Sequence, residues 1–76
     1  MFTNFKISQN DGKITIRGLC IITGKPVEME VLESEFLNYY QNGMLVQDAF
    51  ASLTASQREY FISGISEEEW QNLYGS

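Results

Sequence analysis

The chain has 76 residues, a formal net charge of −5, and five Phe, four Tyr and one Trp, which allow one small domain with a real core and exclude global disorder. It contains no histidine and one cysteine, so the commonest general base and an internal disulfide are excluded, and we expect a non-enzyme without a cofactor. No apolar run approaches the ~20 residues that span a bilayer, and the first residues do not resemble a signal peptide, so we expect a cytoplasmic protein without a membrane partner.

The first part of the chain predicts a β-hairpin. Residues 4–8 alternate weakly between apolar and polar side chains, and QNDG at 9–12 holds the Asp-Gly pair that is typical of a two-residue hairpin turn. The next segment, KITIRGLCII at 13–22, is rich in β-branched residues and predicts a second strand. Gly18 within this segment suggests a bulge or a bend.

A third strand is predicted after a turn at 23–25. Residues 26–31, PVEMEV, alternate cleanly, with the valines and the methionine on one side and Glu28 and Glu30 on the other. This alternation is typical of a half-buried antiparallel strand whose acidic side chains lie in water. Three such strands joined by short turns predict a β-meander.

The hydrophobic period becomes helical in the second half of the chain. Phe36, Leu37 and Tyr40 fall on one helical face, and Gly43 suggests a C-terminal stop for this helix. Residues 44–53, MLVQDAFASL, carry a second apolar stripe with helical spacing. These patterns predict two consecutive helices.

Two capping-box patterns predict the remaining helices. Thr54 is the expected N-cap of one helix, with the side chain of Gln57 reaching back to it, and this helix is expected to stop at Gly64. Ser66 and Glu69 have the same relation at the start of a last helix.

Together these elements predict an α+β fold in a single small domain spanning residues 1–76. The strands, at about 4–31, form an N-terminal three-stranded antiparallel β-meander, and three to four short helices at about 33–75 pack on one of its faces. The core is expected to join the two layers, and its predicted members are Ile14, Ile16, Val27, Met29, Val31, Phe36, Leu37, Phe50, Phe61 and Trp70.

The sequence assigns no catalytic and no metal-ligating residue. It contains no P-loop, no glycine-rich dinucleotide motif and no EF-hand loop. Cys20 lies in a predicted strand without an assured basic neighbour, so we expect a small buried hydrophobe rather than a reactive thiol.

Acidic side chains are the candidate partner-binding residues. Glu67, Glu68 and Glu69 occupy the first turn of a predicted helix, where the helix dipole alone stabilises each by about 0.3–1 kcal/mol, so helix capping and partner binding both remain open. A tyrosine beside the turn at residue 42 could also anchor an interface. The predicted partner-binding set is Glu28, Glu30, Glu33, Glu35, Tyr39, Glu67, Glu68 and Glu69.

Four segments form a recognisable combination: CIITGK at 20–25, NGMLVQDAF at 42–50, LTASQREYFISGI at 53–65 and EEEW at 67–70. They resemble a group of small, mostly uncharacterised bacteriophage proteins, in which zinc-ribbon-like knuckles flank a Gln-Asp-Ala-Phe segment, an Arg-Glu helix and an Ile-Ser-Gly segment. The resemblance covers roughly residues 18–74 and implies a phage or prophage origin. The group has no activity that can be carried over to this chain.

The zinc ligands of that group are lost here except for one. Their positions correspond to Cys20, Thr23, Ser66 and Glu69, and of these only Cys20 binds zinc well. The resemblance therefore implies a fold held without metal, in which the cap at Ser66 stands where a metal knuckle would be.

Three hypotheses for function follow. The first is a phage-type protein that binds and inhibits a host nucleic-acid-handling or defence machine, in the manner of anti-CRISPR or anti-restriction proteins. It would act in the cytoplasm of the infected bacterium, where its acidic surface would bind the basic nucleic-acid-binding groove of the host protein. The alternative is a phage-internal accessory or structural protein without a host target, with a homodimer left open. The third is nucleic-acid binding by a surface that consists of Lys6, Lys13, Arg17 and Lys25. The negative net charge of the chain disfavours this hypothesis, so no direct nucleic-acid partner is expected.

Overall fold

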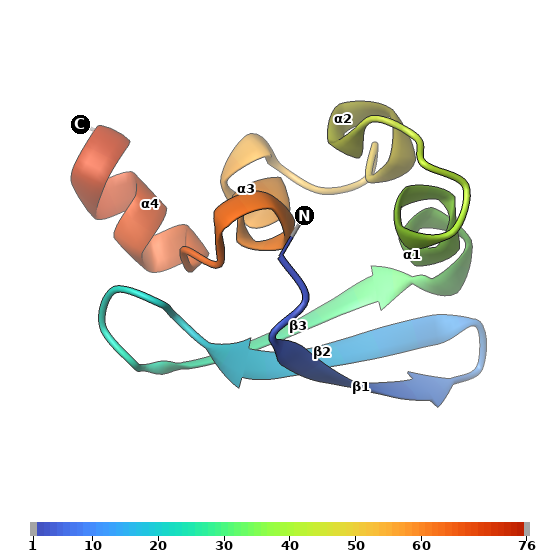
Figure 1. The fold of residues 1–76 in the computed structure, drawn as a ribbon, viewed down its shortest axis with the longest axis horizontal. Helices are drawn as coiled ribbons and strands as arrows, with labels where there is room; N and C mark the ends of the chain where they lie inside the picture. The colour runs from blue at the N-terminus through green and yellow to red at the C-terminus, as the bar shows by residue number, and fades with distance from the viewer. Residues whose placement is uncertain (1, 76) are drawn as a thin grey trace.

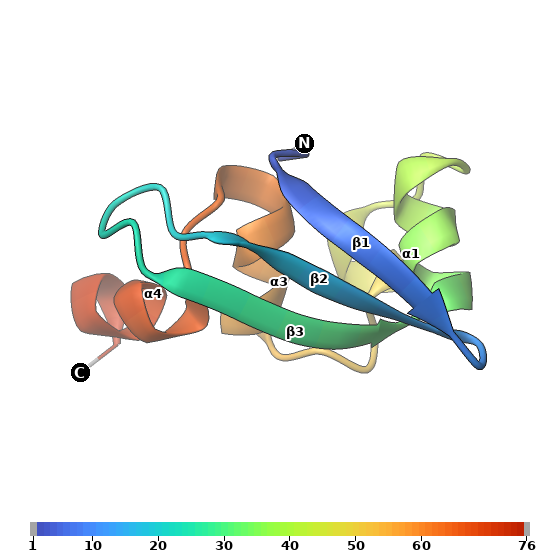
Figure 2. The same ribbon diagram turned by 90° about the horizontal axis from the view of Figure 1, so that it is seen from below.

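The computed structural model describes residues 2–75 and contains three strands and four helices within them. They are, in chain order, β1 (Phe5–Asn10), β2 (Lys13–Leu19), β3 (Pro26–Leu32), α1 (Glu33–Tyr40), α2 (Val46–Ala49), α3 (Ala55–Ser63) and α4 (Glu67–Tyr74). The strands form one antiparallel sheet in the order β1-β2-β3, and the helices lie on one side of it (Figure 1). Figure 2 shows the other face of the sheet without helices. The predicted α+β fold with an N-terminal β-meander is confirmed.

The turn between β1 and β2 follows from its Asp-Gly pair. Asn10 pairs with Lys13, and the two residues between them, Asp11 and Gly12, have φ angles of 50° and 76°. Positive φ at both central positions is the signature of a type I′ turn, whose twist matches that of the flanking strands. The predicted hairpin is therefore confirmed.

Gly18 is not at a bulge, so the first of the two alternatives expected from the sequence is wrong. Strand pairing continues through it, with Phe5 of β1 and Val27 of β3 opposite. A Cβ atom at Gly18 would lie 2.9 Å from the Cβ of Phe5 and would overlap the hydroxyl of Tyr60. The glycine is required because α3 approaches the sheet closely at this point.

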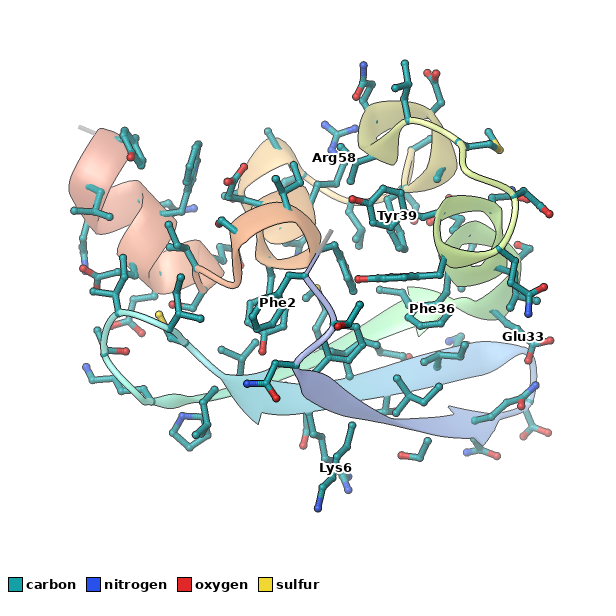
Figure 3. The ribbon with its side chains drawn as sticks, viewed as in Figure 1. Phe2, Lys6, Glu33, Phe36, Tyr39 and Arg58 are labelled. Carbon is teal, nitrogen blue, oxygen red and sulfur yellow. The ribbon has the colours of Figure 1, made fainter. Side chains whose placement is uncertain are left out.

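The core lies between the inner face of the sheet and the helices. Ile16 of β2 is fully buried, and so are Phe50 and Phe61, whose rings stack with their centroids 4.5 Å apart. Phe2 and Phe36 point into the space between the two layers (Figure 3). The predicted core is confirmed for Ile14, Ile16, Val27, Met29, Val31, Phe36, Leu37, Phe50 and Phe61.

Trp70 does not belong to this core, which corrects the prediction. α4 lies at the end of the sheet beside the β2–β3 loop (Figures 1 and 2), and none of its residues is buried. Trp70 packs instead on Tyr74 of the same helix, with ring centroids 4.3 Å apart. An apolar stripe determines which side of a helix faces protein, but it does not determine where the helix docks.

α3 begins and ends as the sequence predicts. The hydroxyl of Thr54 accepts a hydrogen bond from the backbone N–H of Gln57 at 3.2 Å, and the side chain of Gln57 accepts one from the backbone N–H of Thr54 at 3.0 Å. These two bonds make a complete capping box. At the other end, Gly64 has a φ of 81°, a left-handed conformation that glycine adopts without strain.

α4 has only half of its predicted capping box. The hydroxyl of Ser66 accepts from the backbone N–H of Glu69 at 3.2 Å, as expected. The backbone N–H of Ser66, however, donates to Sγ of Cys20 at 3.5 Å rather than to the carboxylate of Glu69. A sulfur atom from the β2–β3 connection thus occupies the place expected for a glutamate oxygen.

α2 is shorter than the helix predicted over 44–53. It ends at Ala49, and Phe50 leaves the helical conformation with φ −106° and ψ 53°. The ring of Phe50 stacks on Phe61 of α3, so tertiary packing overrides the helical pattern here. α1 ends at Tyr40, and Gly43, with a φ of 69°, lies in the loop that follows.

Candidate protein-interaction site

β3 is an edge strand, so one of its sides has no neighbouring strand. Two hydrogen bonds of 2.9 Å flank it, from Cys20 N to Lys25 O and from Glu33 N to Gly12 O. Hydrogen-bonded pairs alternate along antiparallel strands, so the odd-numbered residues between these two bonds are the ones that bond to β2. The backbone N–H and C=O groups of Glu28 and Glu30 therefore point toward the free edge.

A groove runs along this edge, and we call it the β3 groove. It is defined by residues 27–30 of β3, Gln57 and Tyr60 of α3, and residues 66–69 at the start of α4. Thr23, Lys25 and Pro26 line its end at the β2–β3 loop. Its main cavity has a volume of about 290 Å³, and a second cavity of about 190 Å³ adjoins it. The two cavities are continuous because they share lining residues from both β3 and α4.

The β3 groove has an apolar floor and acidic residues along its margins. Val27 and Met29 point to the inner face of the sheet and are half-buried, and they form the floor together with the buried Tyr60. Glu28 and Glu30 line it from β3, with their side chains on the outer face of the sheet, and Glu67 lines it from α4. The described residues that line the main cavity include no lysine and no arginine.

Five of the eight predicted partner-binding residues come together at this groove. Glu28 and Glu30 belong to β3, whereas Glu67, Glu68 and Glu69 form the first turn of α4. The chain connects the two groups through α1, α2 and α3, so their proximity is a product of the tertiary structure.

The other three predicted residues lie elsewhere. Glu33 accepts a hydrogen bond from the side chain of Gln9 and lies near the β1–β2 turn (Figure 3). Glu35 accepts from the hydroxyl of Ser52 at 2.5 Å. The ring of Tyr39 packs on Phe50 with centroids 5.6 Å apart, and burial raises the pKa of its hydroxyl above the ordinary value.

The basic residues of the hairpin face the glutamates of the groove. Their ion pairs are Arg17–Glu28 at 3.0 Å, Lys13–Glu30 at 3.4 Å and Lys25–Glu68 at 3.9 Å. All six side chains are more than half exposed, so each pair contributes roughly 0–1 kcal/mol. Within residues 2–75, Lys6 is the one hairpin cation outside these pairs, and it points away from the helices (Figure 3). Because these pairs offset most of its charge, the hairpin makes a poor phosphate-binding surface.

Glu67 is held in the groove by hydroxyl groups. Its carboxylate accepts hydrogen bonds from Ser56 at 3.1 Å and from Thr54 at 3.4 Å. These donors carry no charge, so they orient the carboxylate without neutralising it. The described hydrogen-bond partners of Glu67 are therefore neutral hydroxyl groups, where the groove meets α4.

Cys20 lies behind the groove, where the β2–β3 connection meets the start of α4. Its side chain is 1% exposed. Burial by itself acts to raise the pKa of the thiol, but hydrogen bonds from the backbone and side chains of Ser66 and Thr23 outweigh it and lower the pKa to about 6. The structure thus brings Cys20, Thr23 and Ser66 together at one point.

No cluster of three or more His, Cys, Asp or Glu side chains suited to a metal ion occurs within residues 2–75. Cys20 is surrounded by hydrogen-bond donors, and Thr23 and Ser66 are weak ligands for zinc. The chemistry of this donor set therefore does not fit a structural zinc ion. In the same part of the chain, none of the helices has the length and apolar character needed to span a membrane.

Sequence reasoning missed the contribution of α3 to the candidate site. Gln57 was assigned to a cap alone, and both Gln57 and Tyr60 line the β3 groove. Met29 was assigned to the core alone, although it is only half-buried. No local pattern marks these residues, because the groove exists only where α3 meets the edge of β3.

What the chain does must be inferred from this site. Comparisons with protein-family models, with curated proteins and with the solved structures found no match to the chain.

Proposed function

We propose that this chain is a non-enzymatic protein of bacteriophage type that binds and inhibits a host nucleic-acid-handling or defence machine in the cytoplasm of the infected bacterium. The observation that carries the proposal is the β3 groove, where acidic residues from two distant segments, 28–30 and 67–69, line one concave surface. A concave acidic surface with an apolar floor favours a protein partner whose own surface is basic.

The inhibition would be steric and electrostatic. The basic groove of the partner normally holds nucleic-acid phosphates, and the glutamates of the β3 groove would take the place of those phosphates. Such binding weakens with salt, because the Debye length falls from about 10 Å at 0.1 M to about 3 Å at 1 M. An affinity that is equal at low and high salt would contradict this mechanism.

Two observations around Cys20 support the proposal. The thiol is buried, so it is not accessible to a substrate, and the chain has no histidine to activate another nucleophile. The approach of Cys20 to Thr23 and Ser66 is the arrangement expected from the resemblance to phage proteins with zinc-ribbon-like knuckles.

The proposal is tested by phage plating on bacteria that carry one defined restriction or CRISPR system and express this chain. The natural chain is expected to restore plating against at least one such system. The variant Glu67→Lys/Glu68→Lys is expected to lose the effect, because it places two cations at the start of α4 and cancels the negative charge of the groove.

The control for this test is Asp48→Lys/Glu59→Lys, which makes the same change in net charge outside the groove. It is expected to behave like the natural chain. Equal loss in both variants, or equal activity in both, would show that the groove is not the inhibitory surface.

One observation favours the alternative of a phage-internal accessory or structural protein. Leu73 and Tyr74 of α4 are 50% and 67% exposed, and Ile21 and Ile22 of the β2–β3 loop are 58% and 50% exposed. Exposed apolar side chains of this kind suit assembly with copies of the same chain. This alternative would be favoured by two results together. Sedimentation would show a stable dimer, and expression of the chain would leave phage plating unchanged against every defence system.

A further inference from the structure

We propose that the β3 groove takes an extended basic segment of its protein partner, which pairs with β3 as a fourth strand of the sheet. This inference rests on the proposed function only in assuming that the groove is the binding surface. It adds the backbone conformation of the bound segment and the order of its side chains.

The backbone of β3 offers the hydrogen bonds for such a strand. The N–H and C=O groups of Glu28 and Glu30 point to the free edge, as the alternation of the β2–β3 pairing requires. In the part of the chain that the structure describes, no other segment bonds to these four groups. An extended peptide is the ligand that satisfies a row of backbone donors and acceptors at the edge of a sheet.

The two faces of β3 specify the side chains of the added strand. Residues opposite Glu28 and Glu30 would lie on the outer face, where a carboxylate stands beside each of them. Residues between them would point inward, over Val27 and Met29, into the cavity of about 290 Å³. The groove therefore fits a segment in which basic and apolar residues alternate.

The charges of the groove favour a basic partner over a second copy of this chain. Pairing two β3 strands would bring the row formed by Glu28 and Glu30 against the same row of the copy, and like charges directly opposite are destabilising. Pro26 and these charges are also features that protect an edge strand from pairing with itself. A strand that carries Lys or Arg converts this repulsion into attraction.

The ion pairs already present do not block such a partner. Arg17 and Lys13 contact Glu28 and Glu30 from β2, and all four side chains are more than half exposed. Exposed pairs of this kind are weak, so a carboxylate can turn toward an incoming cation at little cost. Glu67 adds a carboxylate whose described hydrogen-bond partners are neutral hydroxyl groups.

The test uses a labelled synthetic peptide of about eight residues with alternating Arg and Val, long enough to span β3 at about 3.3 Å per residue. Its binding to the full chain is measured by fluorescence anisotropy. Replacing Glu28 and Glu30 by Gln is expected to weaken binding by about tenfold or more, whereas Asp48→Asn/Glu59→Gln leaves it unchanged. Equal binding to both variants would overturn the proposal.

Backbone methylation of the peptide separates strand addition from simple charge attraction. In antiparallel pairing, the residues opposite Glu28 and Glu30 turn their own N–H groups toward β3. N-methylation at the arginines is therefore expected to abolish binding, and N-methylation at the valines to leave it intact. The reverse result supports a parallel strand, and equal effects of the two modifications would overturn strand addition.

Amide hydrogen exchange gives a second readout on the unmodified chain. In the free protein, the amides of Glu28 and Glu30 are expected to exchange faster than those of Val27 and Met29, and the peptide is expected to slow them. If the peptide binds without slowing either amide, it lies in the groove without pairing with β3. That result would overturn this inference and leave the proposed function standing. A natural chain that restores plating against no defence system would instead remove the proposed function.

Discussion

At the scale of single residues, the close packing of α3 on the sheet requires a glycine at position 18. Its backbone lies in a continuous strand. Because Gly18 has no side chain, the hydroxyl of Tyr60 can lie against the strand and donate a hydrogen bond to Leu19 O at 3.2 Å. A Cβ here would overlap both the hydroxyl of Tyr60 and the Cβ of Phe5, so both must shift. The cost therefore arises from crowding and not from strand propensity.

We expect Gly18→Ala to lower the free energy of unfolding by about 1–3 kcal/mol, because it overpacks the interface between α3 and the sheet. Chemical denaturation measures this change. The double variant Gly18→Ala/Tyr60→Phe removes the hydroxyl that the new methyl group meets, so its loss should be smaller than the sum of the two single losses. Strict additivity would contradict the role given to Tyr60.

The thiol of Cys20 links stability to pH. Its pKa falls from the ordinary 9.0 to about 6 in the folded chain, so between pH 6 and 9 the unfolded chain binds a proton that the folded chain does not. Stability from this group is complete above pH 9 and is lost as the pH falls through 6. We expect the free energy of unfolding to rise from pH 6 to pH 9, by a few kcal/mol at ~1.4 kcal/mol per unit of pKa shift.

The control is Cys20→Ser, which keeps a small polar side chain but does not titrate in this range. Its free energy of unfolding should stay nearly constant between pH 6 and 9. A natural chain that showed the same flat profile would mean that the hydrogen bonds from Ser66 and Thr23 do not stabilise a thiolate.

At the scale of elements, the capping box of α3 is the local signal that positions two of the largest buried side chains of the core. α3 carries Tyr60 and Phe61, both fully buried, and Thr54 determines where this helix begins. A displaced start would rotate both side chains relative to the sheet. Sequence and structure agree here because a cap is satisfied within one turn and needs no tertiary contact.

We expect Thr54→Ala to lower the free energy of unfolding by about 1 kcal/mol, since it removes the oxygen that accepts from the backbone N–H of Gln57. Thr54→Ser keeps that oxygen and should remain within a few tenths of the natural value. Thermal or chemical denaturation of both variants checks this difference. An equal loss in both would assign the effect to the methyl group and not to the cap.

At the scale of the whole molecule, the N-terminal segment joins the layers. The backbone N–H of Phe2 donates to Phe61 O at 2.8 Å, and the hydroxyl of Tyr40 donates to Phe2 O at 2.6 Å. The ring of Phe2 contacts Tyr60 edge-on, with centroids 5.2 Å apart. One residue near the start of the chain thus contacts two helices from the second half.

We expect Phe2→Ala to lower the free energy of unfolding by about 2 kcal/mol, because a half-buried aromatic ring is lost from the space between the layers. Thr3→Ala, at an exposed neighbour, should change it by less than about 0.5 kcal/mol. Urea denaturation measures both variants. A Phe2→Ala variant as stable as Thr3→Ala would show that the N-terminal segment does not hold the layers together.

The sequence predicted the elements of this protein better than it predicted their docking. Alternation in 26–31, the Asp-Gly turn and the cap at Thr54 each depend on a few neighbouring residues, and each is confirmed. Trp70 was wrongly placed in the core, because its stripe defines an apolar side of α4 but not the surface that this side contacts.

For the candidate site too, some features follow from the local sequence and others only from the tertiary structure. By itself, the sequence determined that Glu28 and Glu30 lie on the outer face of a strand and that residues 67–69 begin a helix, since both follow from local periodicity and capping. Only the tertiary structure decided that these two groups line one groove, that Tyr39 does not, and that Gln57 and Tyr60 do. The physical reason is that the groove depends on the distance between the helices and the sheet. That distance is set by tertiary packing, as at Gly18, Phe50 and Phe61, and it cannot be predicted from a local sequence pattern.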